Sequence, residues 1–487
     1  MKGLKIMPKT IDSKGRLVND PVDHKLGSMP IGELLFKMSA PMMISMLMLA
    51  LYNVVDSIFV SRVSEAALSA LSLAYPIQFL MVALNIGTNV GVTALVSRSL
   101  GEKNFDNANN YARHGLIIAF IYFVLFAILG YFFTDDFFKL ITNDEAIRRE
   151  GINYLSIITI YSFGFFIETT YEKIMQATGK SVSSMITQLS GAIFNIIFDP
   201  ILIFGLFGFP ALGTKGAAIA TVGGQIFGTF IGYILNKYTN KEIDSRIIKF
   251  KLRDTKNSVF GPYWTFDTSN LKLDFNMIKN IYIIGIPSII MQAISSFTIF
   301  GLNMILTKYE SAVAVLGVYY KIQSFVFMPV FGLNNGMVPI VSYNFGSHNK
   351  ERIKNVIKSA LKAAFIIMLL GSFIVFLFAA NILHLFNASG NMIRVGTFAF
   401  KAIAIHFPIA GFNIILSSVM QATKREVYSL TASVVRQVVF LIPSAYILSE
   451  LFGVNGTWFC FFISEFMAFI IILFLFIKTY KEQILTL

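Results

Sequence analysis

The chain has 487 residues, of which 55% are hydrophobic and 14% are charged, and its mean hydropathy is +0.67. Soluble domains carry about 25% charged residues, so this composition excludes an ordinary soluble globular protein. The net charge of +13 does not indicate nucleic-acid binding, because the basic residues lie in short segments between apolar runs. The single cysteine, Cys460, excludes a disulfide framework and a cysteine-based metal cluster.

Apolar runs follow one another along the chain, and each has about the 20 residues that a helix needs to cross a bilayer. We therefore predict an all-α membrane protein with twelve transmembrane helices, at 34–60, 72–97, 113–133, 152–175, 184–207, 215–236, 277–306, 313–340, 358–380, 396–421, 430–449 and 456–478. Eleven or thirteen spans are the alternatives, and either would place the chain ends on opposite faces. Residues 1–33 are polar and run into a full span, so we expect no cleavable signal peptide.

The basic residues indicate the orientation of the spans. Roughly 30 of the 40 Lys and Arg residues fall in one alternating set of segments, which identifies the cytoplasmic face. The tails 1–33 and 479–487 belong to this set, so we expect both termini in the cytoplasm and a multi-pass protein of the plasma membrane. The hydrophilic segment 237–276 is basic and has no core-forming pattern. It predicts a cytoplasmic linker between an N-lobe, 34–236, and a C-lobe, 277–478. Contact of this linker with anionic lipid is a second interpretation.

The two halves resemble each other at an offset of about 245 residues. QATGKSVSSM from Gln176 matches QATKREVYSL from Gln421, and LGEKN at Gly101 matches FGSHN at Gly346. Because each half has six spans, the repeats share one orientation and are related by an axis along the membrane normal. Transporters built in this way bind substrate between the halves and rock them for alternating access.

Other function classes have less support. A channel can also be built from repeats, but no segment resembles a selectivity filter. A membrane-embedded enzyme is not indicated, since HExxH, GxSxG and a paired catalytic His–acid set do not occur in the sequence. We therefore expect a transporter and no enzyme.

Two carboxylates lie inside predicted spans, Asp56 in LYNVVDSIFV and Asp199 in FNIIFDPILIF. An ionisable side chain there costs at least about 2.5–3.5 kcal/mol on insertion scales, so both are functional candidates. At 1.5 Å per residue, Asp56, Asp199 and Thr221 all lie roughly 8–12 Å below the outer surface. Asn195 precedes Asp199 by four residues and projects from the same helix face. Gln188 and Gly191 continue that face, Asn53 shares the face of Asp56, and Pro200 frees a backbone carbonyl.

These side chains predict an oxygen-rich pocket suited to a hard cation such as Na⁺. Two neighbouring carboxylates equally favour retention of one shared proton near neutral pH, so the residues leave H⁺ and Na⁺ open. No other cofactor or metal is predicted. In the repeat, Asp56 aligns with Leu302 and Asp199 with Ser444, which favours an ion site in the N-lobe alone. The alternative is structural: each aspartate bonds backbone amides or bridges helices.

The remaining polar residues of the spans are weaker candidates. Glu168, Glu172 and Lys173 lie near the cytoplasmic end of span four, where a local structural pair is favoured. His406 is typical of a hydrogen-bonded core residue, and Arg436 and Glu465 have no assigned role. Tyr52 and Met291, with Met46, Gln292 and Phe297, are candidates for a cavity lining. A cavity rich in Met and aromatic residues suits flat organic cations.

The chain resembles the multidrug and toxic compound extrusion (MATE) family, and within it the multidrug exporters of Gram-positive bacteria. The resemblance runs from about residue 30 to residue 480 and is carried by SAPMMI, YNVVDSIFVSRV, YEKIMQATGKSVSSM, GAIFNIIFDPILIFG and GTKGAAIATVGGQ, in this order and spacing. It implies a V-shaped pair of six-helix lobes.

The resemblance also implies roles for particular residues. Related antiporters bind H⁺ or Na⁺ at positions that match Asp56, Asn195, Asp199 and Thr221, and a proline matching Pro41 is linked to bending of the first helix. Another branch of the family carries essential acids in the second lobe. Leu302, Ser444 and an acid-free span seven depart from that branch, so ion coupling in the C-lobe is not expected.

These observations together predict secondary active efflux of small cationic or amphipathic substrates by antiport with H⁺ or Na⁺, by a monomer in the lipid bilayer. The alternative is a flippase for lipid-linked precursors, which belongs to the same superfamily. A flippase for anionic lipid phosphates would be expected to carry several basic residues in its cavity. Arg436, Lys321 and Lys401 are the residues of this chain that fit that expectation.

Overall fold

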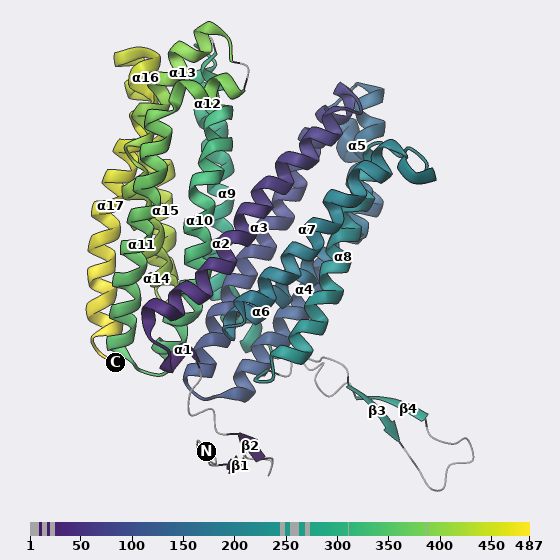
Figure 1. Cartoon of the computed structure of the whole chain (residues 1–487), viewed down its shortest axis with the longest axis vertical. Helices are drawn as coiled ribbons and strands as arrows, with labels where there is room; N and C mark the ends of the chain where they lie inside the picture. The colour runs from purple at the N-terminus through teal and green to yellow at the C-terminus, as the bar shows by residue number, and fades with distance from the viewer. Residues whose placement is uncertain are drawn as a thin grey trace, which may run out of the picture.

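The computed structural model describes residues 9–11, 17–19, 25–243, 249–253, 263–267, 273–309, 311–386 and 388–487. Their helices form two lobes that meet at one end and diverge toward the other, as Figure 1 shows. The start of α2 and the C-terminus lie at the end where the lobes meet, which we call the closed end. The all-α, two-lobed architecture confirms the predicted fold class.

The N-lobe consists of the first half of the helices. They are α2 (Ile31–Ser61), α3 (Glu65–Gly101), α4 (Phe105–Ile141), α5 (Glu145–Ile160), α6 (Phe163–Ala177), α7 (Ser181–Phe204) and α8 (Thr214–Thr239). A four-residue helix, α1 (Lys25–Ser28), precedes α2, and a short 3₁₀ turn, η1 (Leu206–Gly208), follows α7.

The C-lobe repeats this order. Its α-helices are α9 (Phe275–Leu306), α10 (Ala312–Gly346), α11 (Lys350–Leu377), α12 (Ala379–Leu385), α13 (Gly390–Ala404), α14 (Phe407–Ala422), α15 (Glu426–Val434), α16 (Ile442–Thr457) and α17 (Cys460–Thr479). Two π-helical segments, η3 (Val435–Leu441) and η4 (Tyr480–Ile484), join α15 to α16 and extend α17.

Ten helical segments of the described chain are long and apolar enough to cross a membrane. Two further spans are bent pairs, α5 with α6 at 47° and α13 with α14 at 46°, which brings the number to the twelve predicted. The bends occupy corresponding places in the two lobes.

Several helices extend beyond the apolar runs because polar caps begin them. The side chain of Asn104 accepts a hydrogen bond from the backbone of Asn107, so α4 starts eight residues before the predicted span. Asn349, the repeat counterpart of Asn104, accepts one from the backbone of Arg352 and begins α11 in the same way. The starts of α4 and α11 therefore follow the capping residues rather than the hydropathy.

The repeat is also visible in side-chain hydrogen bonds. Gln176 donates to the Ser184 hydroxyl at 2.9 Å, and Gln421 donates to the Ser429 hydroxyl at 3.0 Å. Each pair ties a bent span to the helix that follows it. An offset of 245 residues relates both partners, so the sequence repeat is a repeat of structure.

The lobes meet closely at the closed end through two glycines that are repeat counterparts. A Cβ atom at Gly101 on α3 would overlap the carbonyl oxygen of Tyr343 on α10. A Cβ atom at Gly346 on α10 would overlap the carbonyl oxygen of Arg98 on α3. Glycine at both positions therefore permits the backbones of the two lobes to touch.

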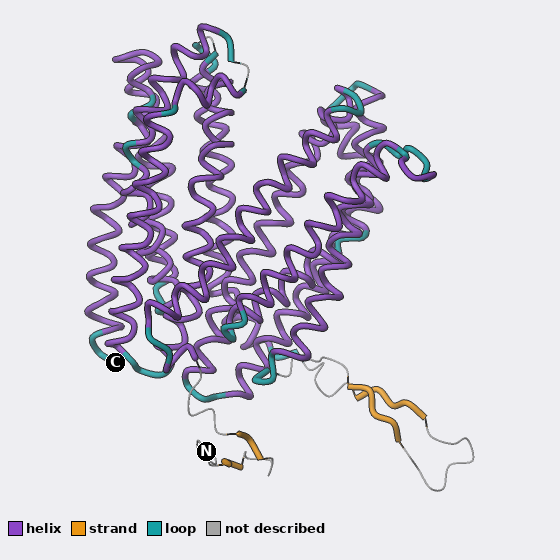
Figure 2. The backbone as a smooth tube through the Cα atoms, in the orientation of Figure 1, coloured by secondary structure: helices purple, strands orange, loops and turns teal. Residues whose placement is uncertain are grey.

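Two short antiparallel ribbons lie outside the helical body, as Figure 2 shows. One pairs β1 (Lys9–Ile11) with β2 (Leu17–Asn19), and the other pairs β3 (Lys249–Arg253) with β4 (Tyr263–Asp267). The segment predicted as a linker contains a ribbon, with Lys249 opposite Asp267. Residues 244–248, 254–262 and 268–272 of the linker lie outside the described residues.

Candidate functional site

Asp56 and Asp199 meet inside the N-lobe. Asp56 lies near the end of α2 that is remote from the closed end, and Asp199 lies on the buried face of α7. Their carboxyl groups lie close enough to interact directly with one another. Asp199 is fully buried and Asp56 is half-buried. Two bare negative charges in such contact would repel strongly, and a shared proton or a bound cation would relieve that repulsion.

Asn195 and Thr221 join this pair. The Asn195 amide lies 3.4 Å from one carboxylate oxygen of Asp199 and 3.2 Å from the Thr221 hydroxyl, and it donates to both. Asn195 is 2% exposed, and Thr221 is half-buried on α8. The structure therefore brings together all four residues predicted for ion binding: Asp56, Asn195, Asp199 and Thr221. We call these four residues the N-lobe acidic site.

Three buried oxygens of the N-lobe acidic site accept no hydrogen bond from the side chains that the structure describes. They are Oδ1 of Asp56, Oδ1 of Asn195 and Oδ2 of Asp199. A buried acceptor without a donor costs about 1–3 kcal/mol, more when it is charged. Oxygen ligands at a buried carboxylate pair fit a hard cation such as Na⁺, and a proton would convert one acceptor into a donor.

Two residues that the sequence reasoning did not assign also lie at this site. The Tyr154 side chain on α5 interacts electrostatically with both Asp56 and Asp199. Its hydroxyl accepts a hydrogen bond of 3.0 Å from Gln78 on α3. Tyr154 is 5% exposed. Gln78 belongs to AYPIQFL at residues 74–80, which the second half repeats as YYKIQSF at 319–325. A polar residue inside an apolar span was the signal that could have identified it.

The other predicted N-lobe residues fall into three groups. Gln188 is half-buried on α7 and stands outside the hydrogen bonds of the acidic site. Pro41 is buried inside α2, which continues as one helix through it. Tyr52 and Asn53 lie on α2, but their side chains are outside the described residues.

Met291 lies in the C-lobe and packs within that lobe. Its sulfur accepts weak hydrogen bonds from Gln421 at 3.8 Å and from Ser429 at 3.7 Å. These two residues form the repeated Gln–Ser pair, so Met291 contacts the junction of α14 and α15.

The expected local pairing holds for Glu172, whose charge interacts with that of Lys173. Among the described residues Lys173 forms no ion pair with Glu168, and it also donates to Gln176 at 3.1 Å and Asn335 at 3.3 Å. Asn335 belongs to α10, so Lys173 links the two lobes. The lysine is directed toward the lobe interface, which a sequence spacing within one helix cannot reveal.

In the C-lobe, Glu465 has partners that the sequence did not indicate. Its carboxylate accepts a hydrogen bond of 2.6 Å from Asn413 and an ion pair of 3.2 Å from Arg436, which stands in the π-helical segment η3. His406 confirms the expectation of a core residue: it is 2% exposed and its Nδ1 lies 2.5 Å from the carbonyl oxygen of Ile403. Glu465, Asn413 and Arg436 thus form one paired cluster inside the C-lobe.

The repeat positions of the two aspartates differ in character. Leu302 is buried among apolar side chains, and the Ser444 hydroxyl donates to the carbonyl oxygen of Leu441 in its own helix. Neither position contributes a carboxylate. The acidic site therefore has no equivalent at these C-lobe positions, in agreement with the prediction.

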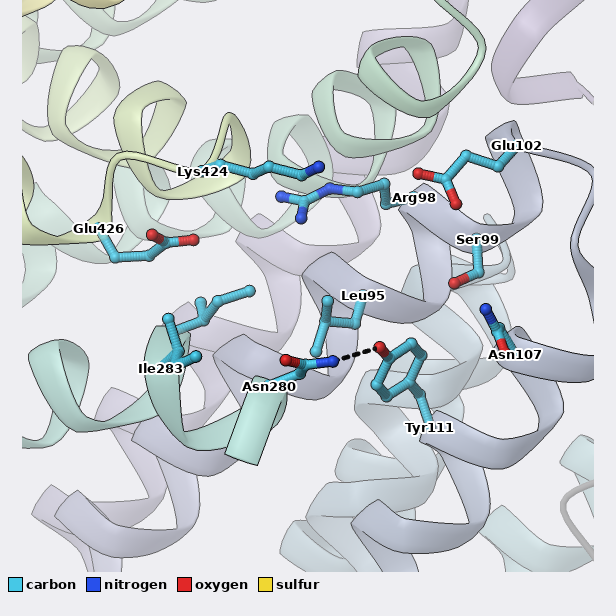
Figure 3. A pocket seen from close by; sticks show the side chains of 11 residues that line it. Leu95, Arg98, Ser99, Glu102, Asn107, Tyr111, Asn280, Ile283, Lys424 and Glu426 are labelled. Atoms are coloured by element: carbon cyan, nitrogen blue, oxygen red, sulfur yellow. Dashed lines mark hydrogen bonds between the residues drawn. The ribbon is translucent and has the colours of Figure 1, made fainter. Parts of the chain in front are cut away.

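A cavity of about 360 Å³ lies between the lobes near the closed end. Figure 3 shows Arg98 from α3 approaching Lys424 and Glu426 from the other lobe. Arg98 donates to the carbonyl oxygen of Ala422 at 3.2 Å, and Asn280 on α9 donates to the Tyr111 hydroxyl on α4 at 3.0 Å. Both bonds cross the lobe interface, so this region holds the closed end together.

The fold and the acidic site define a class: a two-lobed, twelve-span membrane transporter with one buried carboxylate pair in its first lobe. The comparison with known sequences agrees. The chain belongs to the MatE family, whose sequence profile matches residues 41–201 and again residues 287–447, once in each lobe.

Named relatives span nearly the full length of the chain. It is 27% identical to the multidrug export protein MepA of Staphylococcus aureus (strain bovine RF122 / ET3-1), over 90% of this chain and 91% of that protein. It is 27% identical to MepA of Staphylococcus haemolyticus, over 88% and 89%, and 25% identical to an FAD transporter of Shewanella oneidensis, over 89% and 91%.

Solved structures give the same fold. An outward-facing multidrug resistance MATE family transporter of the MOP superfamily is 25% identical and superposes with a TM-score of 0.81, over 92% of this chain and 97% of that one. A MATE structure in the straight conformation superposes with a TM-score of 0.84 at 24% identity, over 94% and 99%. The V-shaped pair of lobes is thus the fold of this chain.

Proposed function

We propose that this transporter exports cationic and amphipathic molecules in exchange for H⁺ or Na⁺, and that the N-lobe acidic site binds the coupling ion. The observation that carries the proposal is the buried contact between the carboxyl groups of Asp56 and Asp199, with three oxygens left without described donors. The similarity to multidrug export proteins supports the substrate class.

Ion binding and substrate binding are coupled because the ion and the cationic substrate compete for the same negative charge. When Asp56 and Asp199 hold no external cation, their negative charge attracts a cationic substrate to the N-lobe. When H⁺ or Na⁺ enters, it neutralises the pair and supplies the missing partner of the unpaired oxygens, so the attraction is lost. Each ligand favours a different arrangement of the lobes, which is the differential affinity that exchange requires.

We also infer the orientation of the molecule in the plasma membrane. The closed end carries the C-terminus and the start of α2, and the basic loops predict that this face is cytoplasmic. The lobes then diverge toward the outside, where an external ion could reach Asp56 near the outer end of α2.

Flippase activity toward anionic lipid precursors has less support. Arg436 is paired with Glu465, and the ammonium groups of Lys321 and Lys401 lie over the rings of Phe386 and Phe376. The basic residues that motivated that alternative are therefore engaged within the C-lobe.

A cellular efflux assay tests the proposal. Cells that lack their own exporters, loaded with ethidium, should lose the dye faster when they express the chain. Asp199→Asn should abolish this efflux at unchanged membrane abundance, because the isosteric amide removes the negative charge. Ser444→Ala, at the matching C-lobe position, should leave efflux intact. Wild-type efflux by Asp199→Asn would refute the site.

A further inference from the structure

Glu168 on α6 is a second buried carboxylate in the N-lobe, separate from the acidic site. The residue is 8% exposed, and no described residue donates a hydrogen bond to its side chain. One carboxylate oxygen lies against two glycines of different helices. A Cβ atom at Gly228 on α8 would overlap this oxygen, and a Cβ atom at Gly191 on α7 would lie 3.0 Å from it. The two glycines therefore make the space that the carboxylate occupies.

In the corresponding region of the C-lobe, a buried carboxylate has side chains of the protein as its partners. The repeat counterpart of Glu168 is Asn413, and that of Gly191 is Arg436. In the C-lobe these two side chains both bind the carboxylate of Glu465. There, a buried carboxylate has an amide and a guanidinium as permanent partners.

The N-lobe has the carboxylate but lacks the permanent cation. Gly191 stands where the repeat has Arg436, and the nearest charged residues on α6, Glu172 and Lys173, form no ion pair with Glu168 in the described chain. Glu172 is a second buried carboxyl group and adds negative charge nearby. A buried carboxylate without a fixed partner is stable only if it binds a mobile cation, a proton included.

The position of Glu168 connects it to the acidic site. Gly191, Asn195 and Asp199 occupy one buried face of α7 at intervals of four residues. The oxygen at Gly191 therefore lies about 12 Å along α7 from Asp199, toward the closed end. Glu172 follows one turn further along α6, beside Lys173 and its bond to Asn335 across the lobe interface.

We propose that Glu168 is a second binding position for the coupling ion, on its route from Asp56 and Asp199 to the cytoplasmic side. This inference rests on the proposed exchange of an ion for substrate. A proton there is held as the O–H of the carboxylic acid and leaves as H⁺; Na⁺ is held by the carboxylate oxygens without covalent change. In both cases Gly191 and Gly228 provide the space.

Transport by purified protein in liposomes tests the proposal. Three variants are compared with wild type: Glu168→Gln, which keeps the shape but carries no negative charge and takes up no proton; Glu168→Asp, which keeps the charge; and Ser190→Ala, a neighbouring control on α7. The substrate is ethidium, and H⁺ and Na⁺ gradients are imposed separately.

We expect Glu168→Gln to bind ethidium within about twofold of wild type and to lose at least tenfold in gradient-driven transport. Glu168→Asp should retain a measurable part of that transport, and Ser190→Ala should equal wild type. Equal transport by Glu168→Gln and wild type would overturn the role of Glu168 and leave the proposed function intact. A wild-type protein that moves no ethidium under either gradient would instead overturn the proposed function.

A measurement on the unmodified protein covers the case in which Glu168→Gln does not fold. Dicyclohexylcarbodiimide adds to protonated carboxyl groups in apolar surroundings, and mass spectrometry locates the adduct. We expect labelling of Glu168 that falls when the pH or the Na⁺ concentration is raised. Absence of labelling, or labelling insensitive to both ions, would contradict the proposal.

Discussion

The carboxyl groups of Asp56 on the first spanning helix and Asp199 on the fifth interact directly inside the N-lobe, although 142 residues separate them in the chain. Asn195 and Thr221 extend this contact to α8, whereas the matching C-lobe positions hold Leu302 and Ser444. The two lobes share a fold but differ in chemistry. The carboxyl pair of Asp56 and Asp199 thus has no counterpart at the matching C-lobe positions.

Removal of the Thr221 hydroxyl should weaken ion binding without preventing transport. Thr221→Val keeps the shape of the side chain and deletes the acceptor that lies 3.2 Å from the Asn195 amide. Loss of one such hydrogen bond costs about 1 kcal/mol, which corresponds to about fivefold in affinity. We expect the ion concentration for half-maximal efflux to rise by that factor. An unchanged ion dependence would remove Thr221 from the site.

The closed end should open when a methyl group is added at the lobe contact. Gly346→Ala places a Cβ atom against the Arg98 carbonyl oxygen, so the contact between the lobes at the closed end becomes strained. The single native cysteine, Cys460, is buried, so a cysteine introduced at Ser99 in the interlobe cavity can report access.

We expect maleimide to label this cysteine several-fold faster in the Gly346→Ala background. Gly390→Ala is the control, because a Cβ atom there meets nothing within 4 Å. Equal labelling in both backgrounds would show that the contact does not hold the closed end.

The Arg436–Glu465 pair should stabilise the C-lobe. Arg436→Gln leaves the Glu465 carboxylate with Asn413 as its remaining described side-chain partner. Removing one member of a buried pair costs about 3–5 kcal/mol, and we expect about 2 kcal/mol because Arg436 is 25% exposed. Thermal unfolding in detergent measures the loss. The double variant Arg436→Met, Glu465→Leu should recover most of it, and failure to do so would point to packing rather than charge.

Reporter fusions should place both ends of the chain in the cytoplasm. A fluorescent protein at the C-terminus should be bright, and alkaline phosphatase at the same position should be inactive. Fusions in the loop between α7 and α8, at residues 209–212, should show the reverse. Active phosphatase at the C-terminus would invert the orientation that the basic loops predict.

Much of the architecture could be predicted because spanning helices obey simple rules. Run length gave twelve spans, and the rise per residue placed Asp56, Asp199 and Thr221 in one layer. The ends of the helices were harder to predict. For example, α4 continues to Ile141, beyond the predicted end at 133, because Asp135, Asp136 and Lys139 pair on its surface. The bends of α5–α6 and α13–α14 occur inside apolar runs and leave no signal in hydropathy.

Contacts between distant helices could not be predicted from one sequence. Glu465 meets Arg436 and Asn413 only because α14, η3 and α17 pack together. Lys173 reaches Asn335 in the other lobe, in addition to its interaction with the adjacent Glu172. Tyr154 joins the acidic site from α5, although Tyr at a helical position in a span is usually packing. In each case the partner is set by tertiary packing.

The most direct measurement of the central claim is ion release by purified protein on substrate binding. Tetraphenylphosphonium is added to the protein in weakly buffered detergent solution, and released H⁺ or Na⁺ is recorded with the respective electrode. We predict release of about one ion for each substrate bound by wild type, and none with Asp199→Asn. Substrate binding that releases neither ion, with an affinity independent of pH and Na⁺, would contradict exchange at Asp56 and Asp199.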